Sequence, residues 1–408
     1  MEFRTIDPGE LEAFFLTITH AFSETEPDVT EAGKARQEID RTFAAIDDGR
    51  IVGGAAAYSF RTVVPGGGAV AAAGLTEVGV LPTHRRRGLM RELLKRYLAQ
   101  AAERGEPMAT LFAAEAAIYG RFGFARASVG VEVDVDAQRA SFVPWYEPAG
   151  QTWIMPHSEA LPALAAVYRA ATETRPGANL LEDRDVEWLF PEKVYPDDTS
   201  DERVEAFFAV HHDADSGPDA YAVYTAKHAW PEGLPNVEIK VSSMGAATAQ
   251  AAADMWRYLI DVDLVSRVKS WDRPLDDPLQ WLLVEPRAMR GKMFDALMAR
   301  PVDVTAALTA RGYLGDGAIT LGVVDGFLPA NDGVYELEVE GGRAVCQRTS
   351  AEPQLSGPVN AIGAVYFGGA TWTELANAGM VREHHPGSLA TADAMFASPV
   401  APWAAYMF

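Results

Sequence analysis

Apolar and polar positions between residues 75 and 107 predict a strand, a turn and a helix. Leu75 to Leu81 form a short apolar run with β-branched residues, and Pro82 ends it. A helix is predicted from about Gly88 to Glu103, because apolar residues recur on one face: Met90, Leu93, Leu94, Tyr97 and Ala101. Gly105 and Pro107 supply its stop signal.

Helical and strand patterns continue along the rest of the chain. The three glycines at 66–68 predict a turn between strands. Residues 145–288 combine apolar helical and strand patterns. From about residue 289, turn signals rich in glycine and aspartate separate strand-like runs at 334–339 and 344–347. Thr371 is placed to cap a following helix.

Length and composition predict a globular protein of two or three domains. The chain has 408 residues, of which 48% are hydrophobic and 23% charged. No apolar stretch approaches the roughly 18 to 20 residues of a membrane span. The acidic start MEFRTIDPGELEAFF lacks the basic and apolar regions of a signal peptide. We therefore expect a cytoplasmic protein with no membrane span.

Cysteine and histidine give no metal-binding signal. Cys346 is the single cysteine, so it cannot form an internal disulfide, and no histidine lies near it in sequence to activate it as a nucleophile. The pairs at 211–212 and 384–385 are adjacent histidines, which point apart on a helix or strand. No metal ion is expected.

The charge of the chain is strongly negative but contains one basic segment. The formal net charge of −22 disfavours nucleic acid, because phosphate binding needs a basic face, and it favours cationic partners. Within residues 84–104, however, two acidic residues are outnumbered by seven basic ones: Arg85, Arg86, Arg87, Arg91, Lys95, Arg96 and Arg104. A solvated helix face is the alternative explanation of such a run.

The basic segment lies at the predicted junction between strand and helix, which favours an anion site. The first N–H groups of a helix lack partners within the helix, and its dipole attracts negative charge. Gly88 allows a close approach of the backbone to a ligand. Neither a P-loop nor a dinucleotide-binding glycine motif follows this strand. We therefore expect the site to bind the diphosphate of a ligand that is neither a nucleoside triphosphate nor a dinucleotide.

These residues resemble the Gcn5-related N-acetyltransferase (GNAT) superfamily, whose pyrophosphate motif corresponds to Arg85–Met90. More specifically, LPTHRRRGLMR followed by AAEAAIYGRFGF resembles the Eis (enhanced intracellular survival) family. The resemblance implies a mixed α/β fold of two tandem acetyltransferase-like domains followed by a sterol-carrier-like domain. The implied domains are 1–144, which binds acetyl-CoA, 145–288, which lacks the pyrophosphate motif, and 289–408.

The resemblance also implies which residues bind acetyl-CoA. Backbone groups of Val78, Gly79 and Val80 are expected to hold the pantetheine arm. Ala114 and Glu115 are expected to contact the coenzyme. The phosphates are expected to lie against six consecutive residues: Arg86, Arg87, Gly88, Leu89, Met90 and Arg91.

Two catalytic groups follow from the same resemblance. Tyr119, in the Y-x-x-x-G-F pattern of 119–124, is expected to act as general acid. A tyrosine pKa of about 10 exceeds that of a cysteine-like thiol by about 1.5 units, so complete proton transfer would cost roughly 2 kcal/mol. The terminal carboxylate of Phe408 is expected to act as base or to orient the substrate, and the apolar segment 400–408 is unlike a solvated tail.

The implied acceptors are primary amines of polycationic small molecules such as aminoglycosides. The acidic residues Glu24, Glu26 and Asp28 are placed to attract such a cation. Met407 stands where family members associated with aminoglycosides carry a glutamate. Two alternatives stay open, a protein or peptide lysine acyltransferase and a non-catalytic lipid-binding or regulatory scaffold. The family resemblance further implies a homo-oligomer, a hexamer.

Overall fold

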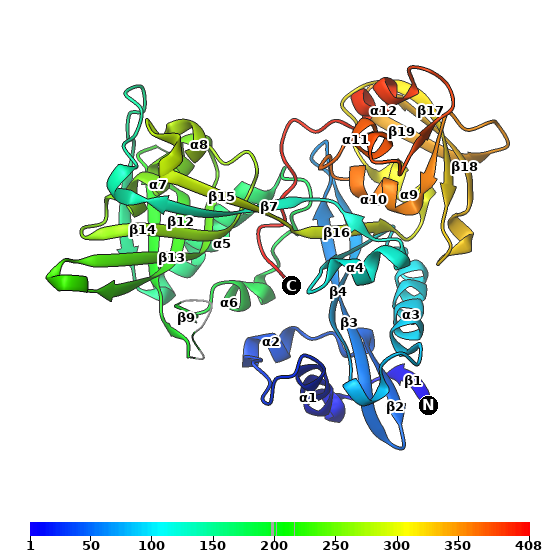
Figure 1. The fold of residues 1–408 in the computed structure, drawn as a ribbon, viewed down its shortest axis with the longest axis horizontal. Helices are drawn as coiled ribbons and strands as arrows, with labels where there is room; N and C mark the ends of the chain where they lie inside the picture. The colour runs from blue at the N-terminus through cyan, green and yellow to red at the C-terminus, as the bar shows by residue number, and fades with distance from the viewer. Residues whose placement is uncertain (197–199, 201, 216) are drawn as a thin grey trace. The chain divides into compact units, whose positions relative to one another are not determined.

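A computed structural model describes residues 1–196, 200, 202–215 and 217–408 of the chain. Contacts within the chain divide it into two compact units, and Figure 1 traces their course from blue to red. Unit 1 comprises residues 1–128, 295–402 and 407–408. Unit 2 comprises residues 129–294 and 403–406.

The first sheet of unit 1 has seven strands in the order β1-β2-β3-β4-β5-β16-β6. Only the pair β4 and β5 is parallel among its described pairings. The strands are β1 (Glu2–Thr5), β2 (Thr42–Asp47), β3 (Arg50–Val63), β4 (Ala69–Val80), β5 (Met108–Phe112), β16 (Leu297–Pro301) and β6 (Ala125–Arg126). The helices of this part are α1 (Leu11–Ala21), α2 (Glu31–Arg36), α3 (Leu89–Glu103) and α4 (Ala116–Tyr119).

Helices α1 and α3 cover opposite faces of this sheet. Ala55 and Ala57 of β3 belong to the apolar core that contains α3, whereas Ala56 belongs to the core that contains α1. Successive side chains of a strand point to opposite faces, so this alternation separates the two helices. Small residues let α1 pack closely, since a Cβ on Gly54 would lie only 2.3 Å from Cε2 of Phe14.

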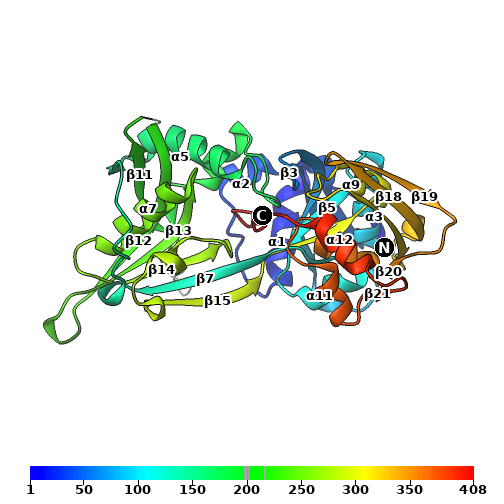
Figure 2. The same cartoon turned by 90° about the horizontal axis from the view of Figure 1, so that it is seen from above.

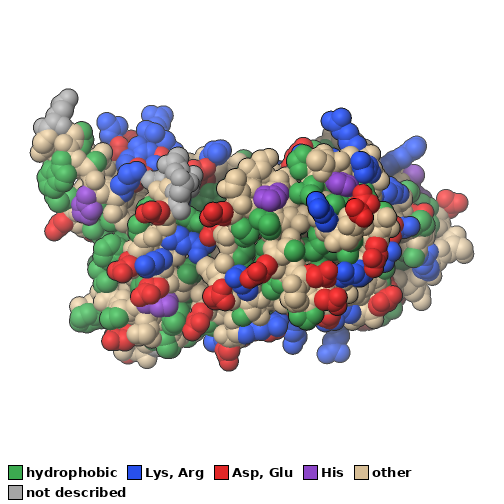
Figure 3. All heavy atoms as spheres, turned by 90° about the horizontal axis from the view of Figure 1, so that it is seen from below, with side chains coloured by type: hydrophobic (Ala, Val, Ile, Leu, Met, Phe, Trp, Pro, Cys, Tyr) green, Lys and Arg blue, Asp and Glu red, His purple; other side chains and the backbone are tan. Residues whose placement is uncertain are grey.

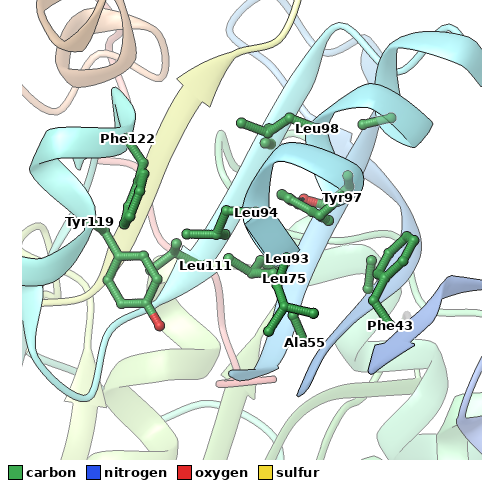
Figure 4. Close-up of a cluster of buried hydrophobic side chains, with 14 of the residues drawn as sticks. Phe43, Ala55, Leu75, Leu93, Leu94, Tyr97, Leu98, Leu111, Tyr119 and Phe122 are labelled. Carbon is green, nitrogen blue, oxygen red and sulfur yellow. Dashed lines mark hydrogen bonds between the residues drawn. The ribbon is translucent and has the colours of Figure 1, made fainter. Parts of the chain in front are cut away.

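The predicted strand, turn and helix of residues 75–103 are confirmed. Helix α3 begins at Leu89 and buries the predicted apolar face, in which Tyr97 also donates a hydrogen bond to the Ala73 carbonyl at 2.7 Å (Figure 4). Strand β4 extends further toward the N-terminus than predicted, to Ala69. The added segment 69–74 contains only alanine, valine and glycine, whose small side chains give a weak apolar signal.

The C-terminal part of unit 1 is a second layered structure with its own core. Its five-stranded sheet has the order β19-β18-β17-β20-β21, with β17 (Gly317–Val324), β18 (Gly333–Glu340), β19 (Arg343–Thr349), β20 (Leu355–Pro358) and β21 (Arg382–Glu383). Its helices are α9 (Val304–Ala310), α10 (Val359–Val365), α11 (Trp372–Asn377) and α12 (Ser388–Phe396). Both predicted strand runs lie within β18 and β19. Thr371 caps α11, accepting a hydrogen bond from the Glu374 N–H.

Unit 2 contains a seven-stranded sheet in the order β15-β7-β14-β13-β12-β11-β8, and Figure 2 shows β7, β14 and β15 alongside one another. The strands are β7 (Val129–Asp136), β8 (Gln151–Met155), β11 (Phe207–Asp213), β12 (Gly217–Ala229), β13 (Asn236–Ala246), β14 (Val265–Arg273) and β15 (Met289–Asp295). Around it lie α5 (His157–Thr172), α6 (Val186–Leu189), α7 (Ala249–Asp261), α8 (Leu279–Leu282) and the short pair β9 (Lys193–Val194) and β10 (Val204–Glu205). The core includes the fully buried Trp256 of α7.

The segment 129–294 of unit 2 begins with strand β7 and ends in strand β15, which is followed by β16 of unit 1. β7 pairs with β14 in the sheet of unit 2, whereas β16 pairs with β5 and β6 in the first sheet of unit 1. The domain boundaries near 144 and 288 stay predictions. No helix in the described part of the chain is long and apolar enough to cross a membrane.

Candidate functional site

A cavity of about 740 Å³ opens in unit 1 beyond the end of β4. Its walls come from the end of α1, the end of β4, the start of α3 and the segment around α4. The predicted site residues around it are Val78, Gly79, Val80, Arg86, Gly88, Leu89, Met90, Arg91, Ala114, Glu115 and Tyr119. Arg87 and Phe408 are the predicted site residues that do not line it. Four further lining residues were not expected from the sequence: Ala21, Phe22, His84 and Ile118.

The turn between β4 and α3 has the backbone geometry of an anion site. Arg86 and Gly88 both adopt the left-handed conformation, with φ of 63° and 83°. Such a turn directs successive backbone N–H groups to one side. Gly88 is the N-cap of α3, and no side chain caps this helix end. The free N–H groups of the first turn are therefore available to an anionic ligand in the cavity.

Arg85 has a different surrounding from the other arginines of the turn. Its guanidinium donates hydrogen bonds to the carbonyl oxygens of Ala21, at 2.6 Å, and Val80, at 3.2 Å. It thereby joins the end of α1 to the end of β4. Arg85 was not among the residues expected to contact the phosphates, and its hydrogen bonds show that it positions the turn.

β4 and β5 separate at the level of the cavity. Their parallel pairing runs from Ala72 opposite Met108 to Leu75 opposite Leu111 and stops there. Beyond Leu75, no described strand pairs with the edge of β4 that faced β5, while the other edge stays paired with β3 as far as Val80. On this open edge the Val80 carbonyl accepts the hydrogen bond from Arg85, and no described strand pairs with the backbone of Val78, so this edge can bind an extended ligand.

Tyr119 ends α4 with its ring buried and its hydroxyl on the cavity side. Figure 4 shows the ring beside Phe122 and Leu111, with the hydroxyl turned away from both. The hydroxyl has no hydrogen-bond partner among the described residues. Burial raises the pKa of Tyr119 to about 12, above the ordinary tyrosine value used in the sequence-based expectation. The hydroxyl is thus a neutral donor at physiological pH.

The turn after Tyr119 is held by residues far away in sequence. The side-chain amide of Asn360, in α10, donates to the carbonyl oxygens of Gly120, at 2.9 Å, and Phe124, at 2.8 Å. The fully buried guanidinium of Arg300, in β16, donates to the Phe122 carbonyl and is paired with Asp325. The C-terminal part of unit 1 therefore determines the position of Tyr119.

Phe408 packs through its ring on the first sheet of unit 1. Its ring centroid lies 4.6 Å from that of Phe60 and 5.4 Å from that of Phe112, with near-perpendicular planes. A Cβ on Gly74 of β4 would lie 3.0 Å from Cε2 of Phe408. The preceding Met407 is 55% exposed. The last side chain of the chain is thus packed against β3, β4 and β5.

Unit 2 contains a strand, helix and parallel strand of the same kind, but its helix end differs. β13 and β14 are parallel and α7 connects them. Thr248 caps α7, accepting a hydrogen bond from the Ala251 N–H at 3.1 Å. The connection between β13 and α7, residues 247–248, contains no arginine. The anion-site features of α3 are therefore not repeated at α7.

Comparisons with known proteins agree with this architecture. The profile of the Acetyltransferase (GNAT) domain matches residues 2–127, a second GNAT profile matches 183–301, and the Sterol carrier protein domain matches 304–405. The N-acetyltransferase Eis of Mycobacterium tuberculosis is 33% identical over 88% of this chain and 86% of its own length. The chain belongs to the Eis family of GNAT acetyltransferases.

Further relatives extend the likeness to the full length of the chain. An uncharacterised N-acetyltransferase of Streptomyces avermitilis is 34% identical over 99% of both chains. The crystal structure of Eis1 from Mycobacterium abscessus superposes with a TM-score of 0.86 at 31% identity, covering all of both chains. A GCN5-related N-acetyltransferase from Anabaena variabilis shares the fold, with a TM-score of 0.84 at 19% identity.

The family establishes the class of activity of this chain. It is an N-acetyltransferase of the acyl-CoA-dependent GNAT type, with two GNAT domains and a sterol-carrier-like domain, as predicted. GNAT acetyltransferases use acetyl-CoA. The donors around the cavity suit this ligand, because a helix N-terminus with arginines fits a diphosphate and an open strand edge fits the amide-containing pantetheine arm.

Proposed function

We propose that unit 1 binds acetyl-CoA in this cavity and transfers the acetyl group to a primary amine of a polycationic small molecule, with aminoglycosides as the leading class. The observation that carries the proposal is the common cavity. It contains an uncapped helix end beside arginines and, on another wall, the unpartnered hydroxyl of Tyr119. The wall with the helix end suits binding of the coenzyme, and the wall with Tyr119 provides a proton donor.

The coenzyme would be held in two places. Backbone N–H groups at the start of α3 and the guanidinium groups of Arg86 and Arg91 would bind the diphosphate, and the exposed Arg87, which does not line the cavity, would add positive charge to the same turn. The open edge of β4 at Val78 to Val80 would pair with the pantetheine arm. Ala114 and Glu115 would contact the coenzyme from the segment after β5.

Tyr119 would assist the departure of the coenzyme thiol. Its pKa of about 12 lies above that of a cysteine-like thiol by about 3.5 units, so forming a free tyrosinate beside a neutral thiol would cost about 5 kcal/mol. This cost exceeds the roughly 2 kcal/mol that an ordinary tyrosine pKa would give. Tyr119 would therefore stabilise developing charge on sulfur by hydrogen bonding before its proton transfers.

The terminal carboxylate of Phe408 would act as base or would orient the amine. The packing of the Phe408 ring on Phe60 and Phe112 supports a fixed chain end. An α-carboxyl group with a pKa of about 3.5 is a weak base. Orienting the amine does not require the surroundings to raise this pKa, whereas accepting a proton does.

The acceptor class rests on charge. The net charge of −22 favours a cationic substrate, and Glu24, Glu26 and Asp28 are exposed after α1. On the face drawn in Figure 3, acidic side chains lie among basic ones. The exposed Met407 carries no charge near the chain end, so we expect weaker attraction of ammonium groups than a carboxylate there would provide.

The proposal extends to assembly and location. We propose a homohexamer in the cytoplasm. Trp145 and Trp281 of unit 2 are 75% and 76% exposed, which favours burial of part of this surface between subunits. Size-exclusion chromatography with light scattering measures the mass directly, and a monomeric mass would contradict the assembly.

A coupled thiol-release assay tests the activity across aminoglycosides, polyamines and lysine peptides. We expect the fastest release with aminoglycosides or polyamines, and a loss in Tyr119→Phe and in a chain extended beyond Phe408. Tyr258→Phe in unit 2 is a matched control that should keep wild-type turnover. Faster release with a lysine peptide would favour the protein acyltransferase, and coenzyme binding without turnover of any amine would favour a non-catalytic scaffold.

A further inference from the structure

Arginine side chains dominate the charged lining of the cavity in unit 1. Among the described residues that line it, one carboxyl group, that of Glu115, accompanies four arginines: Arg85, Arg86, Arg91 and Arg121. Arg85 is engaged by two backbone carbonyl oxygens, and Arg86 and Arg91 belong to the turn and helix proposed to bind the diphosphate. Arg121 comes from a separate segment, the 3-10 helix η4 (Gly120–Phe122), and its charge has no part in that proposal.

The guanidinium group of Arg121 is fixed on one side and open on the other. Its Nε donates a hydrogen bond to the Ile118 carbonyl at 3.0 Å, and its central carbon lies 5.4 Å from the centroid of the Phe122 ring. The residue is exposed, and within the described part of the chain no hydrogen bond or ion pair engages Nη1 or Nη2. A guanidinium held in this way presents a fork of two nitrogens, which matches the oxygens of a phosphate.

Two aromatic rings connect Arg121 with the arginine at the start of α3. The ring of Phe122 meets that of Phe327 edge to face, with centroids 5.0 Å apart. The guanidinium carbon of Arg91 lies 5.2 Å from the centroid of the same Phe327 ring. Both rings are buried, so packing fixes them in place. The rings thus link two cations that come from different walls of the cavity.

These contacts assign Arg121 to the nucleotide end of the coenzyme site. Figure 4 shows Phe122 on the side of the Tyr119 ring that is opposite to the hydroxyl. The hydroxyl of Tyr119 would act at the thioester, whereas Arg91 would act at the diphosphate. Arg121 rests on Phe122 and is linked through it to Arg91. It is therefore placed for the part of the coenzyme beyond the diphosphate, away from the reacting atoms.

Coenzyme A carries a second anionic group next to its diphosphate. The ribose whose 5′-oxygen bears the diphosphate also bears a 3′-phosphate. Like other phosphate monoesters, this group has a charge of about −1.5 to −2 at pH 7 and three acceptor oxygens. The first N–H groups of α3, with Arg86 and Arg91, would be occupied by the diphosphate. The monoester needs a further cation, and the open fork of Arg121 supplies one.

We propose that Arg121 binds the 3′-phosphate of coenzyme A and makes the enzyme selective for acyl donors that carry this group. This inference rests on the proposed function and deepens it, because it names a residue that determines the choice of donor. Acetyl-3′-dephospho-CoA keeps the diphosphate, the pantetheine arm and the thioester but loses the contact with Arg121. The residue contributes to donor affinity and takes no part in the chemical step.

Calorimetric titration of both donors tests the assignment. We expect wild type to bind acetyl-CoA about tenfold more tightly than acetyl-3′-dephospho-CoA. Arg121→Gln should bind the two donors within twofold of each other, and its kcat at saturating acetyl-CoA should equal that of wild type. Arg121→Lys keeps the charge without the fork and should retain a preference of about threefold. Arg126→Gln, exposed on β6, is the matched control and should keep the tenfold preference.

The comparison of two donors separates this role from a structural one. A similar loss of affinity for both donors in Arg121→Gln would assign the residue to the diphosphate or to the fold, and would overturn the proposal. Equal binding of the two donors by wild type also overturns it and leaves the acetyltransferase proposal intact. Failure of wild type to bind acetyl-CoA at all overturns both.

Discussion

The side-chain amide of Asn360 donates a hydrogen bond to the carbonyl oxygen of Gly120, the residue directly after Tyr119, at 2.9 Å. The same amide also holds the Phe124 carbonyl at 2.8 Å. Asn360 lies in α10 of the sterol-carrier-like domain, 240 residues further along the chain. This domain therefore supports the acetyltransferase site through the main chain of the turn that carries Tyr119.

Asn360→Ala should lower kcat with little change in coenzyme affinity. The variant removes two hydrogen bonds, worth roughly 2 kcal/mol together, from the turn after Tyr119. Because Asn360 does not line the cavity, the dissociation constant of acetyl-CoA should stay within twofold. Steady-state kinetics and calorimetric titration measure the two quantities. Asn377→Ala, exposed at the end of α11, is the control, and equal kcat in both variants would contradict the role of Asn360.

Tyr119→Phe should lower kcat by about 100-fold, as expected for loss of a general acid. Burial raises the pKa of Tyr119 to about 12, so the donating, protonated form persists throughout the range from pH 6 to 10. The wild-type kcat profile should consequently show no alkaline limb from Tyr119 in that range. A Tyr119→Phe enzyme with wild-type kcat, measured by thiol release, would remove Tyr119 from the mechanism.

Gly88→Ala should weaken acetyl-CoA binding without any steric clash. A Cβ at Gly88 would have no atom within 4 Å, but φ of 83° disfavours alanine by about 1 to 2 kcal/mol. The turn would relax away from the geometry that directs its N–H groups to the cavity. Calorimetry should show an affinity about tenfold lower. Gly9→Ala is the control, since it also has open space and lacks the positive φ; equal losses in both would exclude the conformational explanation.

His211 of unit 2 should make stability depend on pH. Burial alone would lower the pKa of His211, but hydrogen bonds to Asp219, at 2.6 Å, and to the Ala149 carbonyl, at 2.8 Å, raise it above its usual value. A raised native pKa means that the native state holds the proton more tightly than the unfolded state. The stabilisation is fully present below the unfolded pKa of about 6.5 and is lost as pH rises through the native pKa.

Thermal unfolding followed from pH 6 to 9 measures this effect. The difference in unfolding midpoint between wild type and His211→Gln should shrink as pH rises. His228→Gln, at an exposed position of β12, should show a constant difference. A gap between wild type and His211→Gln that widened with pH would contradict the assignment of a protonated His211.

The domain types follow from the family resemblance, whereas the main elements around the site follow from local sequence. The apolar run after Leu75 and the helical spacing from Met90 to Ala101 are short-range patterns, and they correspond to β4 and α3. The capping residue Thr371 was likewise recognisable, because a cap and its partner lie three residues apart. The N-terminal extension of β4 was not, because alanine and glycine have little preference for strands.

The sequence by itself determined the basic turn, the open helix end and the motif of Tyr119, since each is a contiguous segment whose chemistry depends on neighbouring residues. Only the tertiary structure decided that Arg85 joins α1 to β4 and that Asn360 and Arg300 hold the turn after Tyr119. These relationships join residues far apart in the chain. Packing of the whole fold establishes them, and no local periodicity encodes which distant partners will meet.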